Sequence, residues 1–281
     1  MQTVSPTSLY NLGYAIGARA LAGTIPQTAL VVLDWGAPYC SSASNCGTTL
    51  FSGAYQTTNA ELAAAEQFGL GFYTGSGVDV TARVFVAMGT SNNGSWMASG
   101  SNAFQHGVAW ANMVTNGNNW LQTNGYISQV QLRAAIDAEQ GWNTYPPTRQ
   151  WAVGYTSVST TYFWNFGSAS GCPPIGTCNN GWTQADIHEI SYGFAPAEPL
   201  PEIYNQSTAS EWAAIANSNY MQFLGAMSQW QACADQGSSC VGEDFTPTAV
   251  WNALYTSLNC SGCAAQTPPH VTDIRWKLLA N

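Results

Sequence analysis

Short apolar runs with strand character alternate with segments of helical spacing along most of this 281-residue chain. The clearest runs are residues 29–36, which end in Asp34-Trp35-Gly36, and residues 82–88. Runs rich in β-branched residues are typical of strands buried on both faces of a parallel sheet. Helical spacing at residues 8–22 and 58–68 places a helix before each of these two strands. Such alternation predicts parallel strands joined by helices, either in a closed barrel or in a doubly wound sheet.

The length of the repeating unit favours the barrel. Further strands are expected at residues 127–139, 161–166, 200–204, 221–230 and 271–279, with one more at 48–55 or 70–74. Helices are expected at residues 102–114, 118–123, 147–157, 183–190, 207–216 and 247–258. No glycine-rich phosphate loop follows the first strand, which disfavours a nucleotide-binding doubly wound sheet, the second choice. We therefore predict an α/β fold, a (β/α)8 TIM-like barrel with irregular or missing units, as a single domain over residues 1–281.

The eight cysteines form four close pairs in loops rich in Gly, Ser, Asn or Pro. The pairs are Cys40/Cys46, Cys172/Cys178, Cys233/Cys240 and Cys260/Cys263. An even number of locally paired cysteines predicts four disulfides formed in an oxidising compartment. Zinc is the alternative, but only one pair has CxxC spacing, so we expect no metal. The cysteines therefore predict a secreted, disulfide-bonded protein, whose natural precursor would carry a leader before Met1.

Charged residues make up only 7% of the chain, with 6 basic and 15 acidic residues and a net charge of −9. Nucleic-acid binding needs a basic surface, so this charge balance argues against it. The sequence has no apolar run of 18 residues, and we expect no membrane insertion. A neutral or cationic small molecule or polymer suits this surface better. We expect a monomer that needs no cofactor.

Acidic side chains occur at the carboxyl ends of several expected strands. Asp137 and Glu139 are two residues apart, so on a strand they point to the same face. Asp34 ends the first apolar run, and Glu202 belongs to a later one. Function in a barrel gathers at the carboxyl ends of the strands. Glycoside hydrolysis needs one protonated carboxylic acid and one carboxylate, and crowding two acids raises the pKa of one of them.

These residue types define the predicted catalytic set. Glu139 is the expected general acid, because it is longer and nearer the strand end. Asp137 would stabilise an oxocarbenium-like state or orient a substrate group, Asp34 would assist, and Glu202 is a reserve acid. The alternative is structural: Asp137 pairs with an arginine, and Glu139 is a solvated loop residue.

Aromatic and amide side chains accompany these acids, in a chain with 12 tryptophans and 13 tyrosines. Sugar C–H faces pack on aromatic rings, while sugar hydroxyls need neutral hydrogen-bonding partners. We expect substrate binding by Trp35, Trp142, Asn165, Tyr204 and Trp230. The alternative for any one of the aromatic residues is a place in the core.

Short motifs resemble those of the family 25 glycoside hydrolases, the Chalaropsis-type lysozymes, and of related glycoside-hydrolase-like barrels. Residues 136–139 read Ile-Asp-Ala-Glu, Asp34 ends the first strand, and residues 201–204 read Pro-Glu-Ile-Tyr before a helix that contains Glu211-Trp212. The resemblance implies a secreted barrel that cleaves a glycan such as peptidoglycan, with Glu139 as acid and Asp137 as its neighbour.

Three functional hypotheses follow. The leading one is a secreted glycoside hydrolase that cleaves a neutral or amino-sugar polysaccharide by carboxylate acid/base catalysis. The second is a catalytically inactive barrel that binds carbohydrate, for example in a cell wall. The third is a secreted structural or inhibitor-like protein in which the disulfide loops form a protein interface. A buried Glu139 in a salt bridge would favour the second, and a large exposed apolar patch would favour the third.

Overall fold

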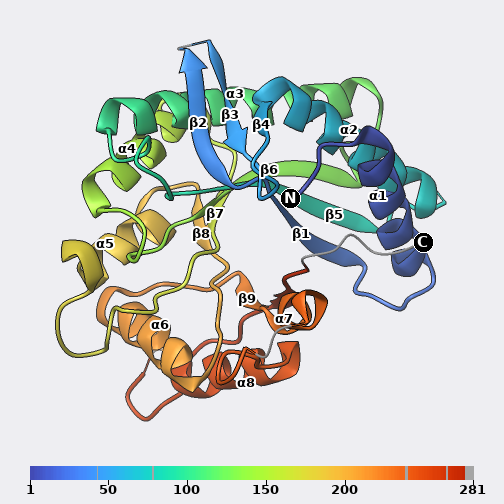
Figure 1. Ribbon diagram of the computed structural model, residues 1–281. Coiled ribbons are helices and arrows are strands. Elements are labelled where there is room, and N and C mark those ends of the chain that lie inside the picture. Colours follow the sequence, from blue (N-terminus) through green and yellow to red (C-terminus); the bar gives the residue numbers. More distant parts are fainter. Residues whose placement is uncertain (43, 78, 238–239, 264, 276–281) are drawn as a thin grey trace.

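The computed structural model describes residues 1–275 except residues 43, 78, 238, 239 and 264. It is an α/β structure around a sheet of five parallel strands (Figure 1). In spatial order these are β1 (Thr28–Asp34), β5 (Arg83–Ser91), β6 (Val130–Asp137), β7 (Phe163–Asn165) and β8 (Ala197–Pro199). Parallel ladders join each neighbouring pair. The predicted α/β class is therefore confirmed.

A second parallel pair continues the strand order beyond β8. β9 (Gly225–Ser228) pairs in parallel with β10 (His270–Asp273). A parallel bridge between Glu202 and Met227 joins β9 to the segment after β8, and the amide of Met227 donates to the carbonyl of Pro201 at 2.8 Å. β10 in turn lies against β1. The resulting order, β1-β5-β6-β7-β8-β9-β10, is compatible with a TIM-like barrel.

Apolar side chains from all of these strands, or from the residues next to them, meet in one cluster on one face. Its members are Leu30, Val32, Phe85, Ala87, Ala135, Trp164, Phe166, Leu200, Leu224, Met227 and Ile274. The alternate strand residues, such as Leu33 and Met88, belong to a larger cluster shared with the helices. Because side chains alternate across a strand, central strands such as β5 and β6 thus have two buried faces.

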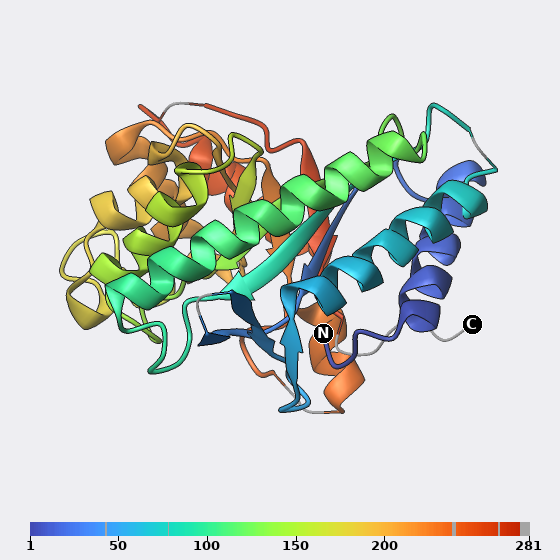
Figure 2. The ribbon, with the colours of Figure 1, turned by 90° about the horizontal axis from the view of Figure 1, so that it is seen from above.

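Helices cover the outer face of the strands. They are α1 (Pro6–Leu21), α2 (Thr58–Gly75), α3 (Gly100–Thr123), α4 (Tyr145–Thr156), α5 (Gln184–His188), α6 (Gln206–Asn219), α7 (Trp230–Gln236) and α8 (Pro247–Leu258). Figure 2 shows α1, α2 and α3 side by side along one flank of the molecule. None of the helices in the described part of the chain is long and apolar enough to cross a lipid bilayer.

Glycines allow two helix pairs to pack backbone against backbone. A Cβ atom added at Gly13 of α1 would lie 2.1 Å from the carbonyl oxygen of Phe68 in α2. Likewise, a Cβ atom at Gly107 of α3 would lie 2.1 Å from the carbonyl oxygen of Trp151 in α4. Any larger residue at these positions would push the helices apart, so glycine is required by close approach.

A small antiparallel sheet lies between β1 and α2. It consists of β2 (Ala37–Ser42), β3 (Asn45–Thr49) and β4 (Tyr55–Thr57), and Figure 1 shows β2 and β3 projecting as a hairpin from the body. The sequence indicated only that a strand could lie at residues 48–55, which span the end of β3 and the start of β4. The other possibility, residues 70–74, is wrong because these residues belong to α2.

Other predicted bounds also change. Residues 102–123 form one helix, α3, where two were expected. The helix predicted to stop at Phe68 continues to Gly75. The strand predicted over residues 221–230 is shorter, because Trp230 already begins α7. The last strand, predicted over residues 271–279, is β10, while residues 276–279 lie outside the described residues.

All four predicted cysteine pairs form disulfides. They are Cys40–Cys46, Cys172–Cys178, Cys233–Cys240 and Cys260–Cys263. The zinc alternative for the CxxC pair is therefore wrong. Four disulfides are typical of proteins that fold in an oxidising compartment, as secreted proteins do.

Candidate active site at the carboxyl ends of the strands

Parallel pairing brings the carboxyl ends of β1, β5 and β6 to one edge of the sheet. Asp34 is the last residue of β1 and is aligned with Gly89 of β5. Asp137 is the last residue of β6 and is aligned with Ser91, the last residue of β5. Glu202 lies after β8, where its backbone bridges both Ser168 and Met227.

Three of the predicted acids, Asp34, Glu139 and Glu202, act electrostatically on the fourth, Asp137, so the structure places the four in one neighbourhood. Burial raises the pKa of Asp137 well above its usual value. Three carboxylates then raise it further: Glu202, Glu139 and Asp34. Burial, followed by repulsion from Glu139, raises the pKa of Glu202 to about 8. We call Asp34, Asp137, Glu139 and Glu202 the acid cluster.

Glu139 is held by its backbone rather than by an ion pair. The Asn92 side chain accepts a hydrogen bond from the Glu139 amide at 3.1 Å and donates to the Glu139 carbonyl at 3.0 Å. Asn92 is completely buried, and its Nδ2 also donates to Thr148 Oγ1 at 3.2 Å. Glu139 itself is half-buried. Burial raises its pKa to about 7, partly offset by hydrogen bonds from Ser168 and Tyr204.

Tyr204 links two members of the acid cluster. Its hydroxyl donates a hydrogen bond to Oε2 of Glu202 and also interacts with the Glu139 carboxylate. Burial and the charge of Glu202 raise the pKa of Tyr204, so its hydroxyl remains a proton donor. The backbone amide of Tyr204 donates to Thr208 Oγ1 at 3.0 Å, which fixes the tyrosine at the start of α6.

Asp137 has an oxygen without a protein partner. Its side chain is only 6% exposed, and Oδ1 accepts no hydrogen bond. Buried carboxyl groups are normally hydrogen-bonded, so this buried oxygen without a donor is unusual. The described residues contain no group of three or more His, Cys, Asp or Glu side chains arranged to hold a metal ion.

The predicted aromatic residues divide into exposed and buried ones. Trp142 is 40% exposed and lies in the turn after Glu139, where its amide donates to the Glu139 carbonyl at 3.3 Å. Trp230 is 44% exposed and begins α7, directly after the carboxyl end of β9. Trp35 is completely buried in the core, so its predicted contact with a substrate is not supported by its position.

Asn165 supports the site from below its surface. It is 1% exposed, and Oδ1 accepts from the amides of Ala138 and Gly167 at 3.3 and 3.1 Å. Its Nδ2 donates to Ser191 Oγ at 2.8 Å. Both polar atoms of the Asn165 amide therefore have protein partners, and they hold the loop that carries Glu139. The sequence had instead predicted direct contact of Asn165 with a substrate.

Further amide and indole groups fix the loop that carries Glu139. Asn180 Nδ2 donates to the carbonyl of Gln140 at 2.7 Å, and Trp182 Nε1 donates to the carbonyl of Asn143 at 2.7 Å. No role for these residues was predictable from the sequence. Their only sequence signal is a high content of amide side chains after β5 and β7, which does not identify their partners.

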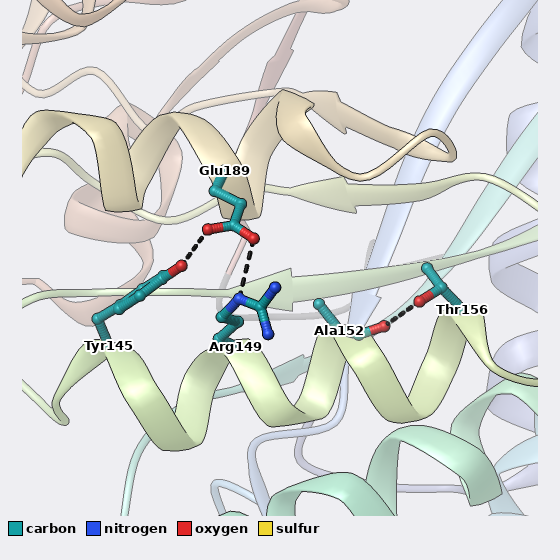
Figure 3. A network of polar contacts seen from close by, with 5 residues as sticks. All are labelled: Tyr145, Arg149, Ala152, Thr156 and Glu189. Carbon is teal, nitrogen blue, oxygen red and sulfur yellow. Dashed lines mark hydrogen bonds and ion pairs between the residues drawn. The ribbon is translucent and has the colours of Figure 1, made fainter.

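A paired carboxylate lies beside the acid-bearing loop. Glu189 accepts hydrogen bonds from Arg149 Nε at 2.9 Å and from the Tyr145 hydroxyl, and Figure 3 shows it facing both. It comes from the π-helical turn Glu189–Gly193 and is tied to α4. Its charge is compensated, so this network fastens the helix that follows the loop.

No protein-family model matches this chain, and neither the curated proteins nor the solved structures compared with it gave a significant match.

Proposed function

We propose that this protein is a secreted glycoside hydrolase with a TIM-like barrel fold. The observation that carries the proposal is the acid cluster at the carboxyl edge of parallel strands, with carboxyl pKa values raised by burial and mutual repulsion. Shifted carboxyl pairs of this kind supply the acid and the base of glycosidases. The barrel is supported by the contact of β10 with β1 and by the apolar cluster shared by all the strands.

Glu139 is the proposed general acid. With a pKa of about 7 it keeps its proton up to neutral pH, and it lies at the half-buried rim of the cluster. It transfers this proton to the glycosidic oxygen as the bond between that oxygen and the anomeric carbon breaks. The leaving sugar departs with the proton, and water supplies the new hydroxyl at the anomeric carbon. The proton that this water loses passes to a carboxylate of the acid cluster, which restores the proton count of the site.

Asp137 is the proposed second carboxyl. Its carboxyl, in which Oδ1 has no protein donor, would stabilise the positive charge that develops on the sugar ring as the bond breaks. Glu202 and Asp34 tune this charge from either side, and Tyr204 orients Glu202 through its hydroxyl. The exposed rings of Trp142 and Trp230 would pack on sugar faces at the rim.

The proposed substrate is a neutral or amino-sugar polysaccharide, because a chain of net charge −9 repels polyanions. Secretion is proposed from the four disulfides. We also propose that the protein acts as a monomer.

A panel assay tests the function. The wild-type protein is incubated with peptidoglycan, chitin, chitosan and neutral glucans, and new reducing ends are measured. We expect release from at least one glycan, and a loss of about 10²–10⁴-fold in Glu139→Gln, because a positioned acid contributes that much. Equal release by the variant would contradict the role of Glu139. Binding of a glycan without any release would favour the inactive carbohydrate-binding barrel.

A further inference from the structure

The amino ends of the strands enclose a cavity that the proposed hydrolysis does not use. It measures about 220 Å³ and is lined from all five strands of the sheet, from β10 and from the residue before β9. The acid cluster lies at the other end of these strands. Every lining residue except Trp164 is half-buried or exposed, so the cavity is open to solvent. Its size suits a ligand smaller than the drug-sized molecules that occupy sites of roughly 300–1,000 Å³.

Two opposite charges line this cavity without meeting. Arg133 on β6 and Glu198 on β8 act on each other electrostatically, yet within the described residues they form no ion pair. Elsewhere in the same protein Arg149 and Glu189 do close an ion pair, at 2.9 Å. A pair kept only for stability would be expected to close in this way, because contact offsets part of the cost of removing two charges from water. The open arrangement leaves both charges to a ligand in the cavity.

The guanidinium of Arg133 is fixed by its own neighbours. Its Nη2 donates to Gln131 Oε1 at 2.9 Å, and its Nη1 donates to the Leu132 carbonyl at 3.5 Å. Its Cζ also lies over two aromatic rings, 4.9 Å from the centre of Phe85 and 5.5 Å from that of Tyr162. Rings at these distances attract a cation. A guanidinium has more N–H donors than these two bonds use, so it can still bind a carboxylate.

The carboxyl group of Glu198 is fixed through one of its two oxygens. Trp164 Nε1 donates to Oε2 at 3.1 Å, whereas Oε1 accepts no hydrogen bond from the described residues. Burial raises the pKa of this carboxyl group, and the hydrogen bond from Trp164 and the charge of Arg133 oppose the rise. A half-buried carboxylate oxygen without a donor is stabilised by a donor that a ligand brings.

We propose that this cavity binds a free α-amino acid with an apolar side chain, whose carboxylate is held by Arg133 and whose ammonium is held by Glu198. The two protein charges cancel, and burial lowers the pKa of His270 in the same wall, which keeps its ring neutral at pH 7. A ligand that carries one charge of each sign matches such a wall. The rest of the lining, which includes Leu30 and Leu224, offers apolar contact to the side chain.

Ligand selectivity follows from the two charges. An amine without a carboxylate would leave Arg133 unmatched, and a carboxylate without an amine would leave Glu198 unmatched. Because charge-assisted hydrogen bonds are about twice as strong as neutral ones, loss of either ligand charge should weaken binding at least about tenfold. Removal of the apolar side chain should have an effect of similar size, since each buried CH2 group contributes to affinity.

Calorimetric titration of the wild-type protein at pH 7 tests this inference. The probes are leucine, leucinamide, which lacks the carboxylate, 4-methylpentanoate, which lacks the ammonium, and glycine, which lacks the apolar side chain. We expect leucine to bind with a Kd below about 1 mM, and each of the other three probes to bind at least about tenfold more weakly. The comparison needs no variant, so it holds even where a substitution prevents folding.

Substitutions then assign the two charges. Glu198→Gln should weaken leucine binding at least about tenfold and leave 4-methylpentanoate nearly unchanged, so that the two ligands bind alike. Arg133→Met should have the corresponding effect on leucine and leucinamide. Glu66→Gln replaces a half-buried glutamate on α2, outside the cavity lining, and should leave every affinity unchanged.

Three results would overturn the inference: no binding of leucine at about 10 mM, equal binding of leucine and any of the other three probes by the wild-type protein, or unchanged leucine affinity in Glu198→Gln. None of these measurements uses a glycan, and the cavity lies apart from the acid cluster. Binding of an amino acid here is therefore tested independently of the proposed hydrolase function, which the glycan panel addresses.

Discussion

The two ends of the parallel strands differ in the donors and charges that surround their carboxyl groups. At the amino end, Glu198 accepts a hydrogen bond from Trp164 Nε1 at 3.1 Å and has Arg133 as a neighbouring positive charge. At the carboxyl end, Asp137 has three carboxyl neighbours and an oxygen without a donor. A carboxyl group with a donor and a positive neighbour, as Glu198 has, is compatible with a stable fold. A buried carboxyl group without them, such as Asp137, marks a site where function opposes stability.

The amino end also shows what a compensated site looks like in this protein. A cavity of about 220 Å³ lies there, lined by Arg133, Glu198, His270 and the aromatic residues Phe85, Tyr162 and Trp164. The Arg133 guanidinium lies 4.9 Å from the centre of the Phe85 ring. In TIM barrels, the fold proposed for this protein, the amino end serves stability and the carboxyl end serves catalysis. The contrast therefore supports the placement of the active site.

The first prediction tests the uncompensated end, where a large effect is expected. Asp137→Asn should lower kcat/KM by about 10²–10³-fold, because it removes the carboxyl group proposed to stabilise positive charge on the sugar ring. The same change removes repulsion, so the variant should melt at a higher temperature than wild type at pH 7. Turnover and thermal melting are measured together.

Asp79→Asn is the control, since Asp79 is a half-buried acid in the loop before β5, at the opposite end of that strand from the acid cluster. It should change neither turnover nor melting appreciably. A lower melting temperature for Asp137→Asn would contradict the idea that this carboxyl is uncompensated.

A smaller loss of activity is expected when the support of the general acid is removed. Asn92→Ala deletes both hydrogen bonds to the Glu139 peptide and should lower kcat about 10–100-fold with little change in KM, because small displacements of a catalytic group are costly. Steady-state kinetics measure the two parameters separately.

The neighbouring Asn93 is exposed, and Asn93→Ala should retain full activity. Equal losses in both variants would show that activity depends on the loop as a whole and not on the two hydrogen bonds between Asn92 and the Glu139 peptide.

At the compensated end, charge removal should affect stability and not turnover. Arg133→Met keeps the apolar stem but leaves Glu198 without its positive neighbour, and should lower the free energy of unfolding by about 1–3 kcal/mol. Urea unfolding measures this change, and turnover should stay close to wild type. Arg19→Met, on the exposed end of α1, should change stability by less than about 0.5 kcal/mol. A loss of turnover in Arg133→Met would break the division between the two ends.

The last prediction concerns the dependence of stability on pH. In the folded protein the pKa values of Glu139 and Glu202 are about 7 and about 8. Both exceed the pKa of a glutamate in an unfolded chain, which is about 4.3. Between these limits the folded protein holds protons that the unfolded chain has released. The free energy of unfolding therefore falls as pH rises from about 4 to about 8, by up to ~1.4 kcal/mol per unit for each carboxyl.

Urea unfolding at pH 5, 6, 7 and 8 measures this slope. Glu202→Gln should make it shallower. A stability that increases steadily to pH 8 would show that the carboxyls of the cluster are compensated after all.

Much of the fold was predictable because local signals agreed with it. The apolar run that forms β1 and the helix Pro247–Leu258 lie where the periodicity places them. The hairpin β2–β3 was not predicted, because its short strands are polar and its pairing depends on contacts with the body of the protein. The length of α2 was underestimated, since Gly69 suggested an end but lies inside the helix, packed near Leu121 and Val130.

The site was predictable in its acids and less so in its surroundings. Strand ends in a parallel sheet must share an edge, so Asp34 and Asp137 could be placed together from the sequence. The roles of Asn92 and Asn165 depend on which peptide groups their amides meet, and no spacing encodes that. The burial of Trp35 likewise results from packing between the strands and helices.

The most direct test of the central claim compares the same substitution at the two ends. Glu139→Gln and Glu198→Gln each replace one partly buried glutamate by its neutral isostere, and turnover is measured on whichever glycan the wild-type protein cleaves. We predict that Glu139→Gln loses about 10²–10⁴-fold in kcat, while Glu198→Gln stays within about threefold of wild type. Similar activity in the two variants, or a greater loss in Glu198→Gln, would contradict the assignment of catalysis to the carboxyl ends of the strands.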